Sequence, residues 1–365
     1  MARIFLSVAG EGRGHATRAR TLLDHLSREH ELMVFAPGLA HELLKPLEQT
    51  HGIPVVRIDG LLNHYDSKGR WEYLPSLLEW VRFAKDSPQQ IARLQEILYR
   101  ELPDLVLTDF EPLLPRAAER CNIPYLSIDH QHYMAAGDLS CLPTRLRLYG
   151  YGMSLGVRNV YRSQLATIIS SFFEVPLQPS ASPLHQVGVF LRHSVVEAQT
   201  TNLGHLVVYI RRRTPPHVLD ALKTTDRPVL VYGLGSRPTE RNLQFRASDE
   251  ASFVRDLASS HALFCTAGNQ IVGEALYLGK PLLVFPEANN HEQEINAHFV
   301  EQMRLGWVTD IASIRAELLR DFLERGGDRV LPPARRHRLN GAPHTVELIR
   351  HYLEADAATA VAAEE

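Results

Sequence analysis

The chain has 365 residues, of which 45% are hydrophobic and 22% are charged, and its formal net charge is −3. This length exceeds one ordinary hydrophobic core and predicts two domains. The composition is that of a globular protein, no apolar run reaches the roughly 20 residues of a membrane span, and the slightly acidic charge excludes a general nucleic-acid binder.

The three cysteines, Cys121, Cys141 and Cys265, have no metal-ligand spacing and cannot pair evenly. The chain enters a strand within its first residues without a signal-peptide pattern. Together these features predict a protein of the reducing cytoplasm. Neither a metal site nor a bound cofactor is expected.

The first predicted strand, Arg3 to Ala9, runs into a glycine-rich turn, GEGRGHATR, that opens a helix. A dinucleotide-binding fingerprint needs its third glycine where His15 stands, and an acidic residue after the second strand. That strand, Leu32 to Phe35, ends in Ala36-Pro37-Gly38, so nicotinamide and flavin binding are disfavoured. His15 keeps two interpretations: a base that takes a proton from a hydroxyl, or a side chain that only hydrogen-bonds the turn.

The next predicted elements are the strands Val55 to Ile58, Leu105 to Thr108 and Tyr125 to Ile128, and the helices His41 to Gln49, Leu74 to Lys85 and Pro88 to Arg100. The last two strands end in polar clusters that begin with Asp109 and Asp129. The carboxyl ends of parallel strands meet at one sheet edge, so these clusters should join His15 there.

An aspartate beside His15 would orient the imidazole and stabilise its charge. Asp109 is the first choice for this partner and Asp129 the second. His130 and His132 alternate along a segment expected to be extended and would point to opposite faces, which disfavours a metal site.

The segment from Pro143 to Arg162 mixes aromatic residues with four arginines, at positions 145, 147, 158 and 162. Such a helix could touch an anionic membrane or a phosphorylated acceptor, although an ordinary surface helix with arginine pairs is the simpler interpretation. Thr167 to Phe173 is predicted as the last strand of the first domain. The proline-rich run Pro176 to Pro183 has the composition of a linker.

The second half alternates strands and helices again and predicts a second parallel sheet. Its strands are expected at His205 to Ile210, Pro228 to Tyr232, Leu243 to Arg246, Ala262 to Cys265 and Leu282 to Phe285. Arg211 follows the first of them and could face a diphosphate, although loop arginines are usually solvated. A last helix is predicted at Thr345 to Leu353, and the alanine- and acid-rich tail is expected to be disordered.

The segment from Ala262 to Ala297 carries the clearest ligand-binding pattern. Gly268 ends a strand and opens a helix whose free amides favour an anion, and Gln270 and Glu274 share one face of that helix. A carboxylate one turn beyond a phosphate suits ribose hydroxyls, and Glu292-Gln293 could reach a further polyhydroxyl group. Phosphate, ribose and sugar make a nucleotide-sugar; the alternative is a plain crossover with solvated polar ends.

In their order and placement, these motifs resemble a GT-B glycosyltransferase, in the group of the peptidoglycan N-acetylglucosaminyltransferase and the UDP-dependent glycosyltransferases. The sequence is similar to a less characterised bacterial and archaeal branch with Gly-x-Gly-His-x-x-Arg at the start and Asp-Phe-Glu-Pro midway. The resemblance covers nearly the whole chain. It implies an α/β fold of two Rossmann-like domains whose parallel sheets face each other across a cleft.

In that architecture, residues 1–180 bind the acceptor and residues 187–335 bind the nucleotide-sugar. A helix at 343–354 is expected to pack back on the N-terminal domain, and residues 355–365 form the disordered tail. By position, the donor diphosphate would be bound by Gly268, Asn269, Gln270 and Arg211. Glu274 would bind the ribose, and Glu292 and Gln293 would bind the donor sugar.

On the acceptor side, Gly12 and Gly14 would line the cleft and His15 matches the histidine proposed as the acceptor base, with Asp109 as its partner. The remaining residues expected in the acceptor cleft are Glu111, Asp129 and His130.

The implied activity is inverting, metal-independent transfer of a hexosyl or N-acetylhexosaminyl group to a hydroxyl of a glycan, a lipid-linked sugar or a small molecule. Uridine is an expectation from the family alone, because Gly233 to Arg241 lacks a base-binding signature. The location implied is the cytoplasm, with peripheral contact at the inner membrane face. The alternatives are a nucleotide-sugar epimerase of the same fold and a non-catalytic sugar-nucleotide-binding protein.

Overall fold

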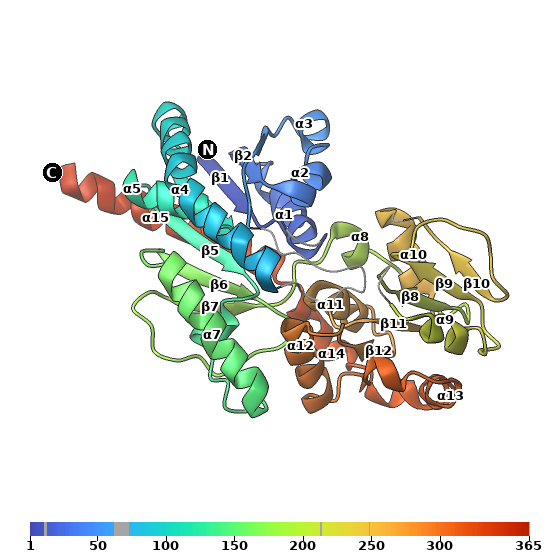
Figure 1. Ribbon diagram of the computed structural model, residues 1–365. Helices are drawn as coiled ribbons and strands as arrows, with labels where there is room; N and C mark the ends of the chain where they lie inside the picture. Colours follow the sequence, from blue (N-terminus) through green and yellow to red (C-terminus); the bar gives the residue numbers. More distant parts are fainter. Residues whose placement is uncertain (11–12, 62–72, 212–213, 248, 365) are drawn as a thin grey trace. The chain divides into compact units, whose positions relative to one another are not determined.

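The computed structural model describes residues 1–10, 13–61, 73–211, 214–247 and 249–364 and divides into two compact units, each built on one parallel sheet (Figure 1). The first unit holds the described residues up to Phe190 together with those from Gly341 onward, and the second is Leu191–Asn340. Gly12, expected in the acceptor cleft, lies outside the described residues.

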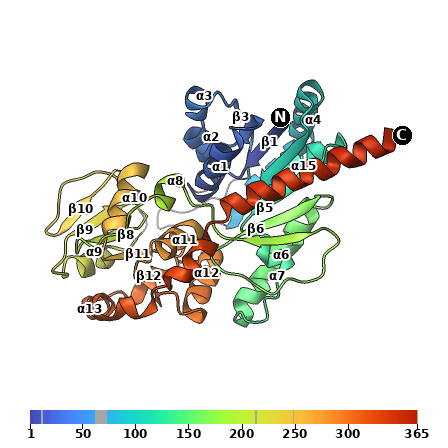
Figure 2. The ribbon, with the colours of Figure 1, turned by 180° about the vertical axis from the view of Figure 1, so that it is seen from behind.

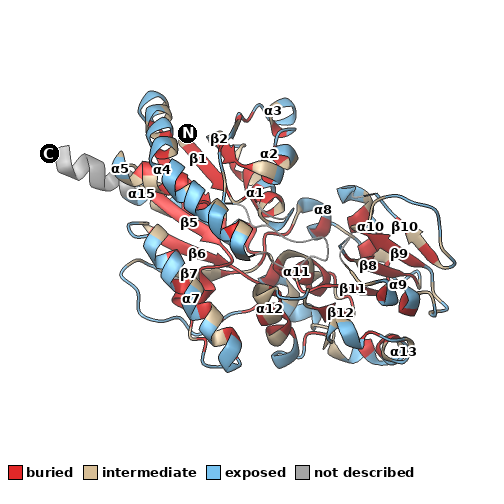
Figure 3. Cartoon of the chain, in the orientation of Figure 1, coloured by how far each residue is buried: buried red, intermediate tan, exposed pale blue. Residues whose placement is uncertain are grey.

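The sheet of the first unit has seven strands in the order β3-β2-β1-β4-β5-β6-β7, and all its pairings are parallel. The strands are β1 Arg3–Val8, β2 Glu31–Ala36, β3 Val55–Arg57, β4 Leu105–Asp109, β5 Tyr125–Asp129, β6 Ala166–Ser170 and β7 Leu184–Val187. The inner strands β4, β5 and β6 are buried along their whole length (Figure 3). Burial on both faces explains their nearly continuous apolar runs.

Helices cover both faces of this sheet. They are α1 Arg13–Leu26, α2 Gly38–Leu44, α3 Leu47–Thr50, α4 Tyr73–Glu101, α5 Leu113–Arg120, α6 Tyr133–Ala136, α7 Thr144–Val160 and α15 Ala342–Glu364. Alternate strand residues feed two cores: Leu6 and Leu107 pack with α1, α2 and α15, whereas Phe5 and Val106 pack with α4, α5 and α7. His15 and Asp109 therefore belong to the face that α1 covers.

Two prolines act differently from the sequence prediction. The helix expected at His41 to Gln49 is divided into α2 and α3, because Pro46 cannot donate the next backbone hydrogen bond. Pro88, in contrast, lies inside the single continuous helix α4, where two helices were expected. The carbonyl of Ala84 that loses its partner belongs to an exposed residue, so water can satisfy it.

The boundary between the units also differs from the prediction. Residues 184–187 form β7, which pairs with β6, so the run Pro176 to Pro183 joins two strands of the first unit rather than two domains. The sequence Leu-His-Gln-Val lacks the apolar alternation that predicts a strand. It is held from the side by α15, since His185 Nε2 lies 2.9 Å from the hydroxyl of Tyr352.

The C-terminal helix α15 packs on the first unit, where Ala342 and Ile349 are fully buried beside α1, and Figure 2 shows it lying along the sheet. Its helical span continues to Glu364, through the residues for which a disordered tail was expected. Alanine and glutamate are strong helix formers, so a helix already anchored in the core extends through them. In the described part of the chain, every helix is too short or too polar to cross a bilayer.

The second unit has a six-stranded sheet in the order β10-β9-β8-β11-β12-β13, again with parallel pairings. Its strands are β8 Leu206–Tyr209, β9 Val229–Tyr232, β10 Leu243–Phe245, β11 Ala262–Thr266, β12 Leu282–Phe285 and β13 Trp307–Val308. Its helices are α8 His193–Val196, α9 Pro216–Leu222, α10 Glu250–Ser259, α11 Asn269–Tyr277, α12 His291–Gln302, α13 Ala316–Arg325 and α14 Pro333–Arg336, with short 3-10 turns at Ile311–Ser313, Gly326–Arg329 and His337–Leu339.

Candidate functional site

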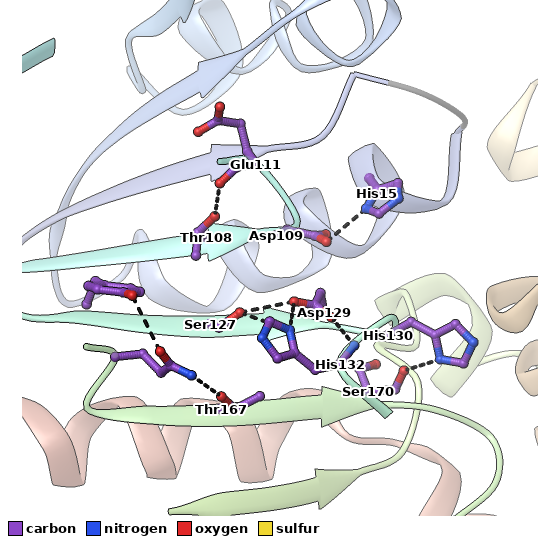
Figure 4. A network of polar contacts seen from close by, with 12 residues as sticks. His15, Thr108, Asp109, Glu111, Ser127, Asp129, His130, His132, Thr167 and Ser170 are labelled. Carbon is purple, nitrogen blue, oxygen red and sulfur yellow. Dashed lines mark hydrogen bonds and ion pairs between the residues drawn. The ribbon is translucent and has the colours of Figure 1, made fainter. Parts of the chain in front are cut away.

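The carboxyl ends of β1, β4 and β5 bring the polar residues of the first unit to one edge of its sheet. His15 lies in the first turn of α1, which follows β1, and Asp109 is the last residue of β4. His15 Nδ1 is 2.8 Å from Oδ1 of Asp109 (Figure 4). The side chains are 14% and 3% exposed, so the carboxylate is shielded from water while part of the imidazole stays accessible.

Arg18, one turn along α1 from His15, completes this cluster. Its Nε lies 2.9 Å from Oδ2 of Asp109 and its Nη2 lies 2.5 Å from Oδ1, so the guanidinium grips the carboxylate with two donors. The same Nη2 is 3.0 Å from His15 Nδ1. The sequence motif Gly-x-Gly-His-x-x-Arg contains this arginine, but no role was predicted for it.

The two neighbours of His15 Nδ1 make opposite demands on its proton, because the Asp109 oxygen accepts whereas Arg18 Nη2, at 3.0 Å, donates. A bare Nδ1 would turn its lone pair toward an ionised oxygen of Asp109 at 2.8 Å, which is repulsive. A protonated Nδ1 donates to that oxygen in a charge-assisted bond, while Arg18 donates to Asp109 as well. In the tautomer that donates from Nδ1 to Asp109, Nε2 keeps the lone pair that a base needs.

Phe110, directly after Asp109, has a strained backbone. Its φ of 55° is in the left-handed region, which a bulky side chain rarely adopts. Its ring lies nearly parallel to the His15 imidazole, with 6.5 Å between the centroids and 17° between the planes. The turn thus places the apolar face of the Phe110 ring beside the His15 imidazole.

Asp129, the second choice as partner of His15, instead pairs with His132. His132 Nδ1 lies 2.5 Å from Oδ2 of Asp129, and the His132 backbone amide donates to Oδ1 at 2.8 Å (Figure 4). Both side chains are buried. The expected extended segment is wrong here, because residues 130–132 form a turn that the Asp129 carboxylate closes.

Glu111 and His130 were expected in the acceptor cleft, but both are 1% exposed. Glu111 accepts hydrogen bonds from the amides of Leu113 and Leu114 at 2.7 and 2.9 Å, so it caps the start of α5. Burial raises the pKa of Glu111 to about 7, against the lowering effect of those amides. His130 Nδ1 lies 3.2 Å from the carbonyl of Ser170. Because both side chains are buried and bonded to the backbone, neither Glu111 nor His130 is placed to contact an acceptor directly.

Gly14, the other glycine expected to line the cleft, lies in the first turn of α1 directly before His15. It is exposed, and a methyl group added there would meet no atom within 4 Å. A glycine with open space in front of it leaves the backbone at the helix start accessible to a ligand.

In the second unit, Gly268 is the N-cap of α11, directly after β11. The first amides of any helix lack intrahelical acceptors and carry partial positive charge. Asn269 is buried and Gln270 half-buried at this start. The arrangement is suited to an anion.

Glu274, one turn further, is held by Arg192, a residue that no sequence motif singled out. Arg192 Nε lies 3.0 Å from Oε1 of Glu274 and Nη2 lies 2.5 Å from Oε2. Gln270 Nε2 also donates to Oε1, at 3.0 Å. Oε1 is thus saturated by two donors, and Oε2 keeps one lone-pair position for a further donor.

A second polar group follows β12. Glu287 exchanges hydrogen bonds with Gln293, whose Oε1 accepts from the Glu287 amide at 2.9 Å and whose Nε2 donates to Oε2 at 3.1 Å. Arg211, at the end of β8, forms an ion pair with the same Oε2 at 3.0 Å. Glu292 is half-buried in the first turn of α12. Glu287 was not singled out from the sequence, since it lay in a polar loop without motif.

The loop after β9 reaches the same edge of the second sheet. Gly233 and Gly235 have φ values of 91° and 78°, which favour glycine. A methyl group on Gly233 would collide with the carbonyl of Ile210, so the loop passes directly against the residue that follows β8. Among the described residues, no group of three or more His, Cys, Asp or Glu side chains is arranged to hold a metal ion.

The chain matches the family model described as Glycosyl transferase family 1 over residues 2–326. It is 25% identical over 335 residues to a protein of Methanosarcina acetivorans named as an uncharacterized glycosyltransferase, covering 83% of this chain and 82% of that one.

Among solved structures, MurG of Acinetobacter baumannii superposes with a TM-score of 0.61 at 14% identity, over 96% of this chain and all of MurG. The glycosyltransferase VinC in complex with dTDP superposes with a TM-score of 0.59 at 16% identity, over 97% of this chain and all of VinC. At such identities the likeness concerns the fold, and the predicted fold class, two parallel-sheet α/β units of the GT-B type, is confirmed.

Proposed function

The chain belongs to glycosyl transferase family 1 and is a glycosyltransferase, and from this premise we propose that it transfers a sugar from a UDP-linked donor to a hydroxyl acceptor with inversion at the anomeric carbon. The observation that carries the proposal is the His15–Asp109 pair at the carboxyl edge of the first sheet. It leaves a free imidazole lone pair on an accessible ring, as a general base requires.

In the proposed reaction, His15 Nε2 takes the proton of the acceptor hydroxyl as its oxygen attacks the anomeric carbon. A new C–O bond forms while the bond to the nucleoside diphosphate breaks, and the leaving group takes the electron pair. Asp109 stabilises the imidazolium that results. The proton on His15 then returns to solvent or to the departing diphosphate.

The second unit would bind the donor. The start of α11 at Gly268 supplies amides for the diphosphate, and Arg211 supplies a cation at the same sheet edge, so negative charge on the leaving group is stabilised without a metal. Glu274 would accept from the ribose hydroxyls at the free position of Oε2. A second ribose contact requires Gln270 to turn away from Oε1.

Gln293 and Glu292 would recognise the donor sugar. Gln293 is fixed by its reciprocal bonds to Glu287, which orient the start of α12 toward this edge. Preorganised polar groups of this kind distinguish sugars by the positions of their hydroxyls. VinC, bound to dTDP, supports a nucleoside diphosphate as the donor carrier.

Incubation with a panel of UDP- and dTDP-linked sugars tests this function. With an acceptor present, we expect release of the nucleoside diphosphate and a glycoside of opposite anomeric configuration. Donors that bind should raise the thermal midpoint, because a ligand of the native state stabilises it. Conversion of a donor into its epimer with no acceptor present would instead identify the protein as an epimerase.

We also propose that α7 makes peripheral contact with the inner membrane face from the cytoplasm. Leu148, Tyr151 and Leu155 are 64%, 50% and 73% exposed and recur at helical spacing on one face. The sequence of α7 contains three arginines and no acidic residue, which favours an anionic lipid surface. Flotation with anionic vesicles should carry the protein, and Leu148→Ser with Leu155→Ser should abolish this; equal flotation with neutral vesicles would contradict the proposal.

A further inference from the structure

We propose that Arg18 is a positioning residue that shares the Asp109 carboxylate with His15 and thereby keeps the His15 imidazole neutral until the acceptor delivers its proton. This inference rests on the proposed base role of His15. Arg18 would act on the reaction through His15 and Asp109, both of which it contacts directly. Arg18 would therefore set the protonation state of His15 when the acceptor binds.

The Asp109 carboxylate accepts hydrogen bonds from both His15 and Arg18. Its two oxygens receive three donors: Nδ1 of His15 at 2.8 Å and Nη2 of Arg18 at 2.5 Å on Oδ1, and Nε of Arg18 at 2.9 Å on Oδ2. The Arg18 and Asp109 side chains are 6% and 3% exposed. A guanidinium fork bound in this way fixes the plane of the carboxylate through its two hydrogen bonds. The fixed plane in turn sets the direction of the imidazole.

Arg18 and Asp109 together are a neutral pair, so a proton on His15 adds a net positive charge to a shielded site. An Asp109 carboxylate without Arg18 would stabilise the imidazolium and hold the proton in the resting enzyme. A base already protonated cannot accept the proton of the acceptor. Arg18 thus weakens the stabilisation that the Asp109 carboxylate gives to a protonated His15.

The neighbouring elements supply the remaining charges. The Asp129 carboxylate at the end of β5 interacts with Arg18, but it is already paired with His132. Tyr161, at the end of α7, is buried, and its pKa is raised by that burial and by the carboxylates around it, Asp109 included. It therefore stays neutral. Arg18 is the described cation in direct contact with both His15 and Asp109.

Titration of His15 by NMR tests the inference directly. The full chain is labelled with 13C-histidine, and the His15 signal is assigned by its loss in His15→Gln. In Arg18→Gln and Arg18→Met, we expect the midpoint of the His15 titration to rise by about one pH unit or more, because a cation at 3.0 Å is removed while Asp109 stays. Arg18→Lys, which keeps the charge, and Arg20→Gln, at an exposed site on α1, should shift it by only a few tenths.

A midpoint that stays unchanged or falls in the neutral variants would overturn the proposal, as would a rise in Arg18→Lys as large as in Arg18→Gln. If one neutral variant fails to fold, the other and Arg18→Lys still decide. The NMR readout needs no substrate, so it separates this inference from the base role. Unchanged turnover in His15→Ala would refute the base role whatever the titration shows.

Discussion

The pair formed by Arg192 and Glu274 should stabilise the second unit only while both members are present. Their side chains are 13% and 2% exposed and are joined by two hydrogen bonds. Burial acts to lower the pKa of Arg192, but Glu274 and Glu250 outweigh it and raise that pKa, so the guanidinium stays charged. Deleting one partner of a buried pair leaves an uncompensated charge and costs about 3–5 kcal/mol.

We therefore expect Glu274→Gln to lower the free energy of unfolding by about 3 kcal/mol, at the lower end because Glu250 lies 3.7 Å from Arg192 and compensates it in part. At roughly 2–4 °C per kcal/mol for a unit of this size, the thermal midpoint should fall by about 6–12 °C. Arg192→Met should cost a similar amount. The double variant should recover about 2 kcal/mol of the summed loss, since neither charge is then left alone.

Calorimetry of the full chain measures all three variants. The control is Glu197→Gln, which breaks an exposed ion pair with His193. The side chains of His193 and Glu197 are 69% and 66% exposed. An exposed pair contributes less than about 1 kcal/mol, so this variant should melt with the wild type. Additive losses in the double variant would refute the coupling, and with it the view that Arg192 holds the carboxylate assigned to the ribose.

Three further predictions concern stability and metal dependence. Gly279→Ala should destabilise by roughly 1–2 kcal/mol in chemical denaturation, because φ is 65°, a left-handed conformation that is strained for alanine; an equally stable variant would contradict this. Burial raises the pKa of Glu111 from 4.5 to about 7, so the native state holds this proton more tightly and the wild type should lose stability as pH rises from 4.5 to 7. Because glutamine does not ionise, Glu111→Gln should lose up to about 3 kcal/mol less of its free energy of unfolding over this pH range than the wild type does. Parallel curves of unfolding free energy against pH for the two proteins would contradict this prediction. Turnover should persist in EDTA, and loss restored by a divalent ion would show that the α11 start and Arg211 do not suffice.

The pairing of His15 with Asp109 followed from the sequence because it depends on a general property of parallel sheets. Both residues come directly after buried strands, and such strands end at one edge. The same rule brought Asp129 to that edge, but the rule carries no information on side-chain direction. Asp109 and Asp129 lie on opposite faces of the sheet because they occupy opposite parities in their strands, and only the pairing register reveals this.

Other features lacked any local signal. Strand β7 is held by β6 and α15, contacts distant in sequence, so its own residues show no strand pattern. Arg192 meets Glu274 across 82 residues, and no spacing rule connects the two. Pro88 marked a helix end in the sequence, yet α4 runs through it, with Phe83 before the proline and Ile91 after it packed against the same core. In each case tertiary packing overrides local propensity.

The base role of His15 is tested most directly by measuring turnover and nucleoside diphosphate affinity in the wild type and in His15→Ala. Turnover should fall by roughly 10²–10⁴-fold, while calorimetric titration with UDP or dTDP should give an unchanged Kd, because the proposed donor residues lie in the second unit. Full turnover in His15→Ala, or loss of nucleotide binding in that variant, would contradict the account.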